Sequence, residues 1–217
     1  MANNIVEPIA LLTFAAACFS LCWLFVDSLM LRIEMKTMLK ALGFAGLGIG
    51  STLTFFDQSI PTSFLHVLIW LTSISFFAIF LAFIADPQSK FQLGIIIAIV
   101  ALPFLKDHDF LTLQAILIAL SMLQLAYTTK HRDIIPLGIG FALIAIAEFF
   151  YSLKTKEGFE GMETAGAFLY LFSAVALFSW VWSYLKIRFI DVSKRSPFSN
   201  SQRRNLRIED DDEENIY

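Results

Sequence analysis

The sequence predicts an all-α fold, a polytopic membrane helix bundle with seven transmembrane helices. Hydrophobic residues make up 57% of the 217 residues and charged residues only 16%, with 23 phenylalanines. Soluble domains average about 45–50% apolar and about 25% charged residues. Before Tyr184 the chain divides into successive apolar runs, most of them near the roughly 20 residues that a bilayer-spanning helix needs. These observations exclude a soluble enzyme, a nucleic-acid-binding domain and a disordered chain.

Short charged or turn-forming segments separate the apolar runs and set the limits of the helices. The fourth run is the shortest and lies between Pro87 and Pro103. The next break, from Lys106 to Asp109, contains an Asp-His-Asp sequence, which we expect to be a solvated turn and not a metal site. The seven helices are expected at 8–31, 38–56, 62–85, 91–105, 110–129, 134–153 and 163–187.

The distribution of lysine and arginine predicts the orientation, because cytoplasmic loops of membrane proteins are enriched in these residues. With the N-terminus outside, the outer segments hold only Lys106, Lys154 and Lys156 of the 16 lysines and arginines. We therefore expect the N-terminus outside and the C-terminus inside. The sequence has no Asn-x-Ser/Thr glycosylation acceptor, which favours a prokaryotic cytoplasmic membrane.

The second and sixth apolar runs resemble each other. LGFAGLGIGSTLTFF begins at Leu42 and LGIGFALIAIAEFFY begins at Leu137. Each begins with Leu-Gly near the cytoplasmic side and reaches Phe-Phe near the outer side. This predicts a 3+1+3 tandem repeat, with copies at 8–85 and 110–187 and a linker helix at 91–105. Chance similarity between helices rich in leucine, glycine and phenylalanine is the alternative.

Small residues recur at four-residue spacing in the same two runs. Gly46 and Gly50 form a GxxxG pair, and Gly138 and Ala142 form a similar pair. Such pairs allow helix backbones to approach closely. We expect them to pack helices within the bundle, with a dedicated dimer interface as the alternative.

Ionisable residues inside a membrane are costly and often functional, and Glu148 is the best candidate here. It follows Ile134 by 14 residues, which at 1.5 Å per residue is about 21 Å into the roughly 30 Å hydrocarbon core. Other polar groups are expected at the same depth. Together with Glu148, they predict a ligand-binding pocket that is open to the outside. The alternative is that Glu148 snorkels or is protonated. The predicted pocket residues are Glu148, His66, Glu7, Gln114 and Tyr151.

Motifs of enzymes and cofactor-binding proteins are missing from the sequence. There is no Gly-x-Ser-x-Gly elbow, no His-Glu-x-x-His, no phosphate-binding loop and no Cys-x-x-Cys. We therefore expect a non-enzymatic protein with no cofactor.

The last segment, 188–217, is expected to be a disordered cytoplasmic tail. Its basic residues come first and an acidic run from Glu209 to Glu214 follows. The basic residues can contact anionic lipid or dock a protein partner electrostatically, unless they serve only as a topology anchor. The residues predicted to make these contacts are Lys186, at the end of the seventh helix, and the tail residues Arg188, Lys194, Arg195, Arg203, Arg204 and Arg207.

Three segments carry a resemblance to seven-helix membrane input modules of microbial sensor proteins. They are LRIEMKTMLKALGF (31–44), AIAEFFYSL (145–153) and LFSWVWSYLKIRF (177–189). The 3+1+3 plan is also similar to that of SWEET and PQ-loop transporters, although Pro87-Gln88 falls after the third helix instead of within the first helix of a repeat. The first resemblance implies a sensory module, and the second implies a solute transporter.

Two functions follow as hypotheses. The first is a sensory or accessory membrane module that acts through a partner protein, which the sparse polarity and the charged tail favour. The alternative is a transporter of a small solute or a lipid-like ligand, with its site between the repeats. Both place the ligand near Glu148.

Overall fold

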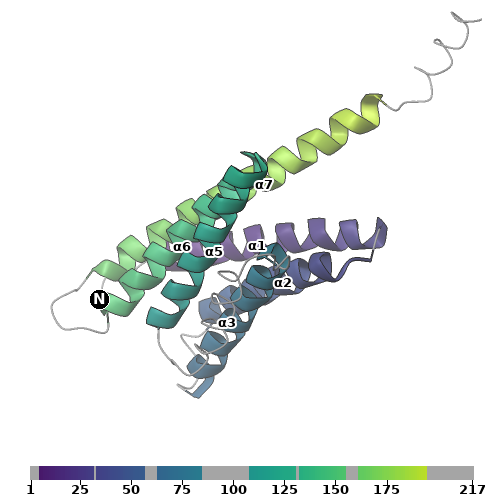
Figure 1. The fold of residues 1–217 in the computed structure, drawn as a ribbon. Coiled ribbons are helices and arrows are strands. Elements are labelled where there is room, and N and C mark those ends of the chain that lie inside the picture. Colours follow the sequence, from purple (N-terminus) through teal and green to yellow (C-terminus); the bar gives the residue numbers. More distant parts are fainter. Residues whose placement is uncertain are drawn as a thin grey trace, which may run out of the picture. The chain divides into compact units, whose positions relative to one another are not determined.

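A computed structural model describes residues 5–31, 33–56, 63–84, 108–130, 132–154 and 161–194, without the side chains of 63–66, 84, 154 and 187–194. All regular structure in these ranges is helical (Figure 1), which confirms the all-α prediction. The predicted fourth span, 91–105, lies outside the described residues. The helices are α1 (Val6–Leu31), α2 (Met35–Phe56), α3 (Ser63–Ile84), α5 (His108–Thr129), the 3-10 turn η3 (Arg132–Ile134), α6 (Ile135–Lys154) and α7 (Met162–Lys194).

The end of α7 differs most from the prediction. The helix continues to Lys194 instead of ending at 187, so 188–194, which we expected in the tail, are helical. Hydropathy marks where a helix leaves the apolar layer, but glycine and proline stop a helix. After Gly166 the next such residue is Pro197. Nothing in the sequence therefore ends α7 at the predicted position.

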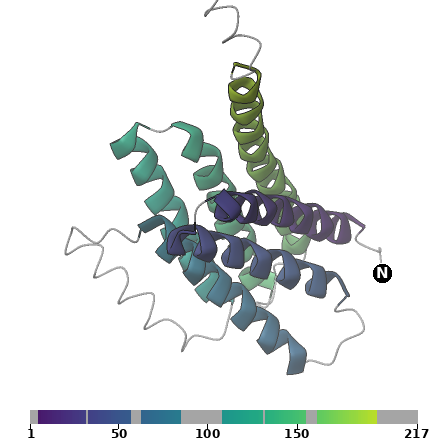
Figure 2. The same cartoon turned by 90° about the vertical axis from the view of Figure 1, so that its right-hand side faces the viewer.

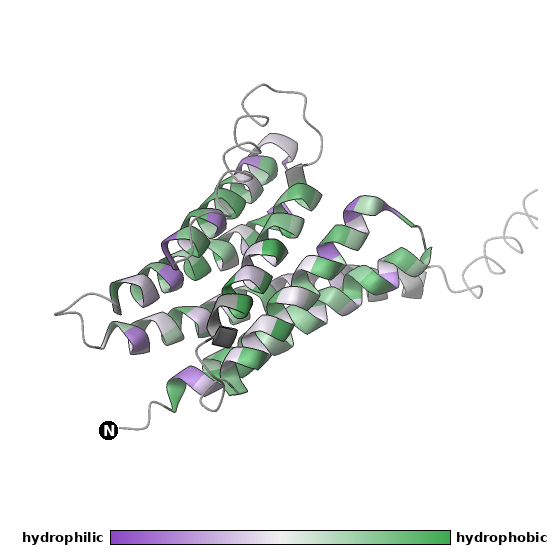
Figure 3. Cartoon of the chain, turned by 90° about the horizontal axis from the view of Figure 1, so that it is seen from below, coloured by the Kyte–Doolittle hydropathy of each residue, from purple (hydrophilic) through white to green (hydrophobic). Residues whose placement is uncertain are grey.

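Five of the described helices, α1, α2, α5, α6 and α7, are long and apolar enough to cross a membrane, and α3 contains a shorter apolar stretch at Val67–Phe83. Apolar residues, in green, recur along the helices in Figure 3. Large side chains in mid-helix remain exposed, including Trp23 at 72%, Ile74 and Phe172. Exposed apolar surface on this scale marks a lipid-facing or partner-facing surface. The described helices form a helical membrane bundle.

The chain divides into two compact units at Val181. The first contains α1 to α6 and the beginning of α7, and the described part of the second is 182–194. Within the first unit, α2 packs along both α1 and α3, α5 packs along α6, and α3 contacts α5 (Figure 2). The beginning of α7 lies close to α6, since a Cβ at Gly140 would be 3.0 Å from Leu177.

Three buried phenylalanine rings join the helices at the centre of the first unit. Phe141 of α6 lies 6.3 Å from Phe44 of α2 and 6.0 Å from Phe76 of α3, measured between ring centroids. All three side chains are buried. Aromatic pairs at these separations contribute about 0.5–1.5 kcal/mol beyond the burial of their area. The rings therefore hold α6 against α2 and α3.

Three of the small residues predicted to pack helices, Gly46, Gly50 and Gly138, do so. Gly46 and Gly50 of α2 face Ser75 and Thr72 of α3, and Gly138 of α6 faces Leu123 and Ala119 of α5. Their missing side chains allow neighbouring helices to approach closely. The tandem duplication of the two halves stays a prediction.

Candidate functional site

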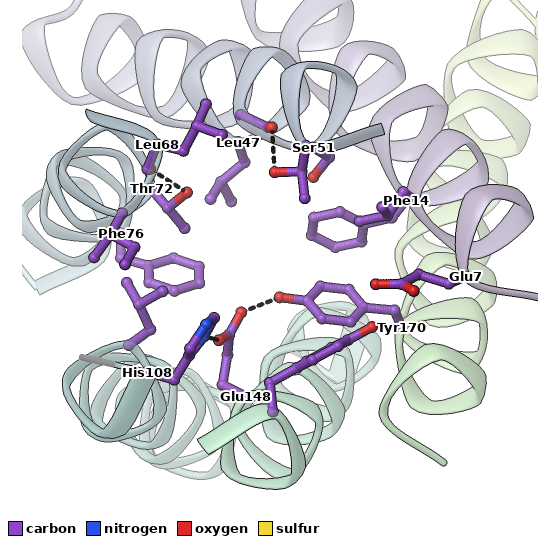
Figure 4. Close-up of a pocket in the computed structure, with 16 residues that line it drawn as sticks. Glu7, Phe14, Leu47, Ser51, Leu68, Thr72, Phe76, His108, Glu148 and Tyr170 are labelled. Atoms are coloured by element: carbon purple, nitrogen blue, oxygen red, sulfur yellow. Dashed lines mark hydrogen bonds and ion pairs between the residues drawn. The ribbon is translucent and has the colours of Figure 1, made fainter. Parts of the chain in front are cut away.

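A cavity of about 360 Å³ lies inside the first unit and is lined by residues from all six described α-helices (Figure 4). The lining residues lie toward the beginning of α1, α3, α5 and α7 and toward the end of α2 and α6, so they share one end of the bundle. The sixteen residues are Glu7, Leu11, Phe14, Leu47, Gly50, Ser51, Thr54, Leu68, Ile69, Thr72, Phe76, His108, Leu111, Glu148, Tyr151 and Tyr170.

The carboxylate of Glu148 is the centre of a polar cluster in this cavity. His108 Nδ1 lies 2.8 Å from Glu148 Oε2, and the Tyr170 hydroxyl donates a hydrogen bond to Glu148 Oε1. Glu148 is only 4% exposed, whereas the His108 side chain is 34% exposed. An ionised carboxylate only accepts hydrogen bonds, so when Glu148 is ionised His108 donates from Nδ1. The cluster joins α5, α6 and α7.

The position of Glu148 on α6 follows from helical spacing. Residues three and four apart lie on one face of a helix, and Phe141, Ile144, Ala145 and Glu148 are all buried. The apolar residues of this face pack into the core. Because Glu148 lies on the same face, its side chain also points into the core. A carboxylate at this place must have partners, because an unpaired buried charge is strongly disfavoured.

Aromatic rings surround the cluster. Tyr151 stacks on the His108 ring and also lies against Tyr170, with 6.0 Å between ring centroids in both pairs. Phe14 of α1 meets Tyr170 edge-on at 5.1 Å. These contacts fix the orientations of the His108 and Tyr170 rings, which both contact Glu148.

A second polar contact joins α5 to α6 beside the cluster. The Ser152 hydroxyl donates a hydrogen bond to the Asp109 carboxylate. Ser152 lies one turn after Glu148, and Asp109 directly follows His108. The two neighbouring contacts set the register between the start of α5 and the end of α6.

Three of the predicted pocket residues, Glu148, Glu7 and Tyr151, do line one cavity. Gln114 is buried but is not among the residues that line this cavity, so its place in the site stays a prediction. Its amide Nε2 donates to the Ser73 carbonyl oxygen at 3.4 Å, which directs the side chain toward α3. The side chain of His66 lies outside the described part of the structure.

His108 is the residue that the sequence prediction missed. We expected 106–109 to be a solvated turn, but His108 begins α5 and its side chain contacts Glu148. The sequence did contain a signal that could have found His108, because two consecutive helices joined by a short loop form an antiparallel hairpin. Such a hairpin brings the start of one helix to the end of the next, and Glu148 lies close to the end of α6.

The basic residues predicted to contact lipid or a partner are only partly described. Lys186 is exposed near the end of α7. Arg188 and Lys194 lie in the last turns of the same helix, and their side chains are outside the description. The remaining four, Arg195, Arg203, Arg204 and Arg207, lie beyond the described residues.

Chemically, the cavity combines apolar walls with a few hydrogen-bonding groups, which is the usual composition of a small-molecule site. Among the described residues, no group of three or more His, Cys, Asp and Glu side chains is placed to hold a metal ion. Comparison of the chain with protein-family models, with curated proteins and with solved structures found no match.

Proposed function

We propose that this protein is a multi-pass membrane protein that binds a small molecule in the Glu148 cavity and passes the binding event to a partner protein, as a non-enzymatic sensory or accessory module. The observation that carries the proposal is that one cavity has walls from all six described α-helices. A ligand there touches every one of them.

The size and composition of the cavity support a binding role. Its volume of about 360 Å³ lies at the lower end of the roughly 300–1,000 Å³ found for ligand pockets. Glu148 and His108 provide charge and hydrogen bonds, while Phe14, Phe76 and Leu111 provide apolar contacts. A site with a few fixed polar groups on an apolar wall selects ligands by both shape and chemistry.

The placement of the cavity suits a signalling role. A ligand shifts a conformational equilibrium only by as much as its affinities for the two states differ. Since the walls come from every described α-helix, a change in helix packing changes the ligand contacts, and ligand affinity must differ between two packings. The charged segment after α7 is then the part that contacts the partner.

One observation favours transport as a second candidate function. Gln114 of α5 and Ser173 of α7 are buried, and Gln114 Oε1 and Ser173 Oγ have no hydrogen-bond partner among the described residues. Both residues lie about one turn or more further along their helices than His108 and Tyr170. Polar atoms beyond the cavity are what a path for a solute requires.

A compound screen against the purified protein in lipid nanodiscs tests the proposed function. We expect some compounds to raise the thermal unfolding midpoint, because a ligand that binds only the folded state stabilises it. Ser51→Phe should remove the effect, since Ser51 lines the cavity and phenylalanine fills it. Ser179→Phe places the same side chain at an exposed position of α7 and should keep the effect.

Circular dichroism and size-exclusion chromatography establish that both variants are folded. Stabilisation that is equal in Ser51→Phe and Ser179→Phe, or no stabilising compound at all, contradicts the proposal. Compounds that bind are then tested for uptake into proteoliposomes. Uptake assigns transport, whereas binding without uptake supports the sensory role.

A further inference from the structure

The described lining of the cavity holds more acidic than basic side chains. It includes the carboxyl groups of Glu7 and Glu148, one histidine, and no lysine or arginine. When both carboxyl groups are ionised, they place negative charge at the wall of the cavity. Glu7 also lies in the first turn of α1, where the helix dipole stabilises a negative charge. In a site of low dielectric constant, this charge attracts a cation and repels an anion.

Two threonine hydroxyl groups among the lining residues offer hydrogen-bond acceptors to a ligand. Thr54 Oγ1 donates its proton to the Gly50 carbonyl oxygen at 2.9 Å, and Thr72 Oγ1 donates to the Leu68 carbonyl oxygen at 3.0 Å. A hydroxyl group has a single proton to donate and two lone pairs. Once the proton is used within the helix, only the lone pairs remain for a ligand. These two threonines therefore favour a ligand that donates hydrogen bonds.

Glu148 retains the capacity to accept further hydrogen bonds. Each carboxylate oxygen has two lone-pair directions, and His108 and Tyr170 each occupy one direction, on different oxygens. The two donors also hold the carboxylate in a fixed orientation toward the cavity (Figure 4). Each oxygen therefore keeps one lone-pair direction for a ligand N–H group beyond these two partners.

The aromatic residues add a second attraction for a cation. Phe14, Phe76, Tyr151 and Tyr170 all line the cavity. The face of an aromatic ring attracts an ammonium group within about 6 Å of the ring centroid, most strongly where water is excluded. The same rings accept the apolar part of a molecule, so one site can hold both ends of an amphiphilic amine.

We propose that the ligand of this cavity is a small organic ammonium ion, a protonated amine with a compact apolar substituent. Its nitrogen donates hydrogen bonds to Glu148, and its substituent packs among the aromatic residues. This inference rests on the proposed function, because it names the chemical class of the ligand for the same cavity.

Three compounds of similar shape and different charge test it: 2-phenylethylammonium, 2-phenylethanol and 3-phenylpropionate. Binding is measured by calorimetry at pH 7 on the full chain in phosphatidylcholine nanodiscs, whose neutral surface does not concentrate the amine. We expect the ammonium ion to bind at least about tenfold more tightly than the alcohol, a difference that one charge-assisted hydrogen bond can supply. The carboxylate should not bind measurably.

Glu148→Gln keeps the shape of the side chain and removes its charge. It should weaken binding of the ammonium ion at least about tenfold and leave binding of the alcohol unchanged. Glu34→Gln changes an exposed carboxylate before α2 and should change neither. If Glu148→Gln does not fold, the comparison of the three compounds on the unaltered protein still decides the question.

The outcomes separate this inference from the proposed function. Equal binding of ammonium ion and alcohol, preference for the carboxylate, or binding of none of the three overturns the inference. The proposed function stands in each case if the compound screen gives ligands that Ser51→Phe excludes. If the screen gives no such ligand either, both fail together.

Discussion

Replacing Glu148 with alanine is expected to lower the free energy of unfolding by about 1–3 kcal/mol, the usual cost of leaving a buried hydrogen-bonding partner unsatisfied. The truncation removes the acceptor of both the Tyr170 hydroxyl and His108 Nδ1. Tyr170 is buried and has no access to bulk water as a replacement. The lost carboxylate also removes the polar link between these side chains of α5 and α7, which leaves Tyr151 of α6 in contact with both rings.

Reversible unfolding in mixed detergent micelles measures this change. Glu34→Ala is the matched control, because Glu34 is an exposed carboxylate and substitutions at exposed sites usually change stability by less than about 0.5 kcal/mol. A Glu148→Ala protein as stable as the Glu34→Ala protein would mean that the carboxylate has no structural partners. The cluster described here would then be wrong.

Replacing Gly43 with alanine is the second change with a large expected effect. A Cβ at Gly43 would lie 2.5 Å from Ile79 Cγ1, 2.9 Å from the Ser75 carbonyl oxygen and 3.2 Å from Ile79 N. Two of these atoms belong to the backbone of α3, so the helix itself must move to accept the methyl group. Inserting a methyl group into a packed core costs typically about 1–3 kcal/mol, and we expect a loss of this size.

Gly50→Ala is the matched control on the same helix. A Cβ there would meet only Thr72 Oγ1, at 3.2 Å, and a side-chain hydroxyl can shift where a backbone cannot. We expect Gly50→Ala to destabilise the protein much less than Gly43→Ala in the same unfolding experiment. Equal effects of the two substitutions would contradict the close packing of α2 on α3 at Gly43.

The helices were predictable because the apolar runs are long and the breaks between them are charged. The positions of α1, α2, α3, α5 and α6 follow the hydropathy closely. The exception is the end of α7, where the apolar layer and the helix end at different residues. Hydropathy depends on transfer into lipid, whereas helix termination depends on backbone chemistry. The end of an apolar run therefore does not show where the helix ends.

The candidate site was predictable only in part, for a related reason. Glu148 is an ionisable residue in an apolar run, which a single sequence reveals directly. His108 is equally important in the cluster, but its neighbours Lys106, Asp107 and Asp109 give it the composition of a turn. Its role depends on the register between α5 and α6. Depth along a helix also does not fix the face on which a side chain lies, and the Gln114 amide is directed toward Ser73 of α3.

The proposed site depends on the contact between His108 and Glu148, and a double-mutant cycle measures the energy of that contact. His108→Phe keeps a ring against Tyr151, Glu148→Leu keeps the side-chain bulk, and the double variant completes the cycle. We expect the two changes to be coupled by more than about 0.5 kcal/mol in the free energy of unfolding, as for residues in direct contact. Additivity within about 0.3 kcal/mol would show that the two side chains do not interact, and the proposed site would lose its centre.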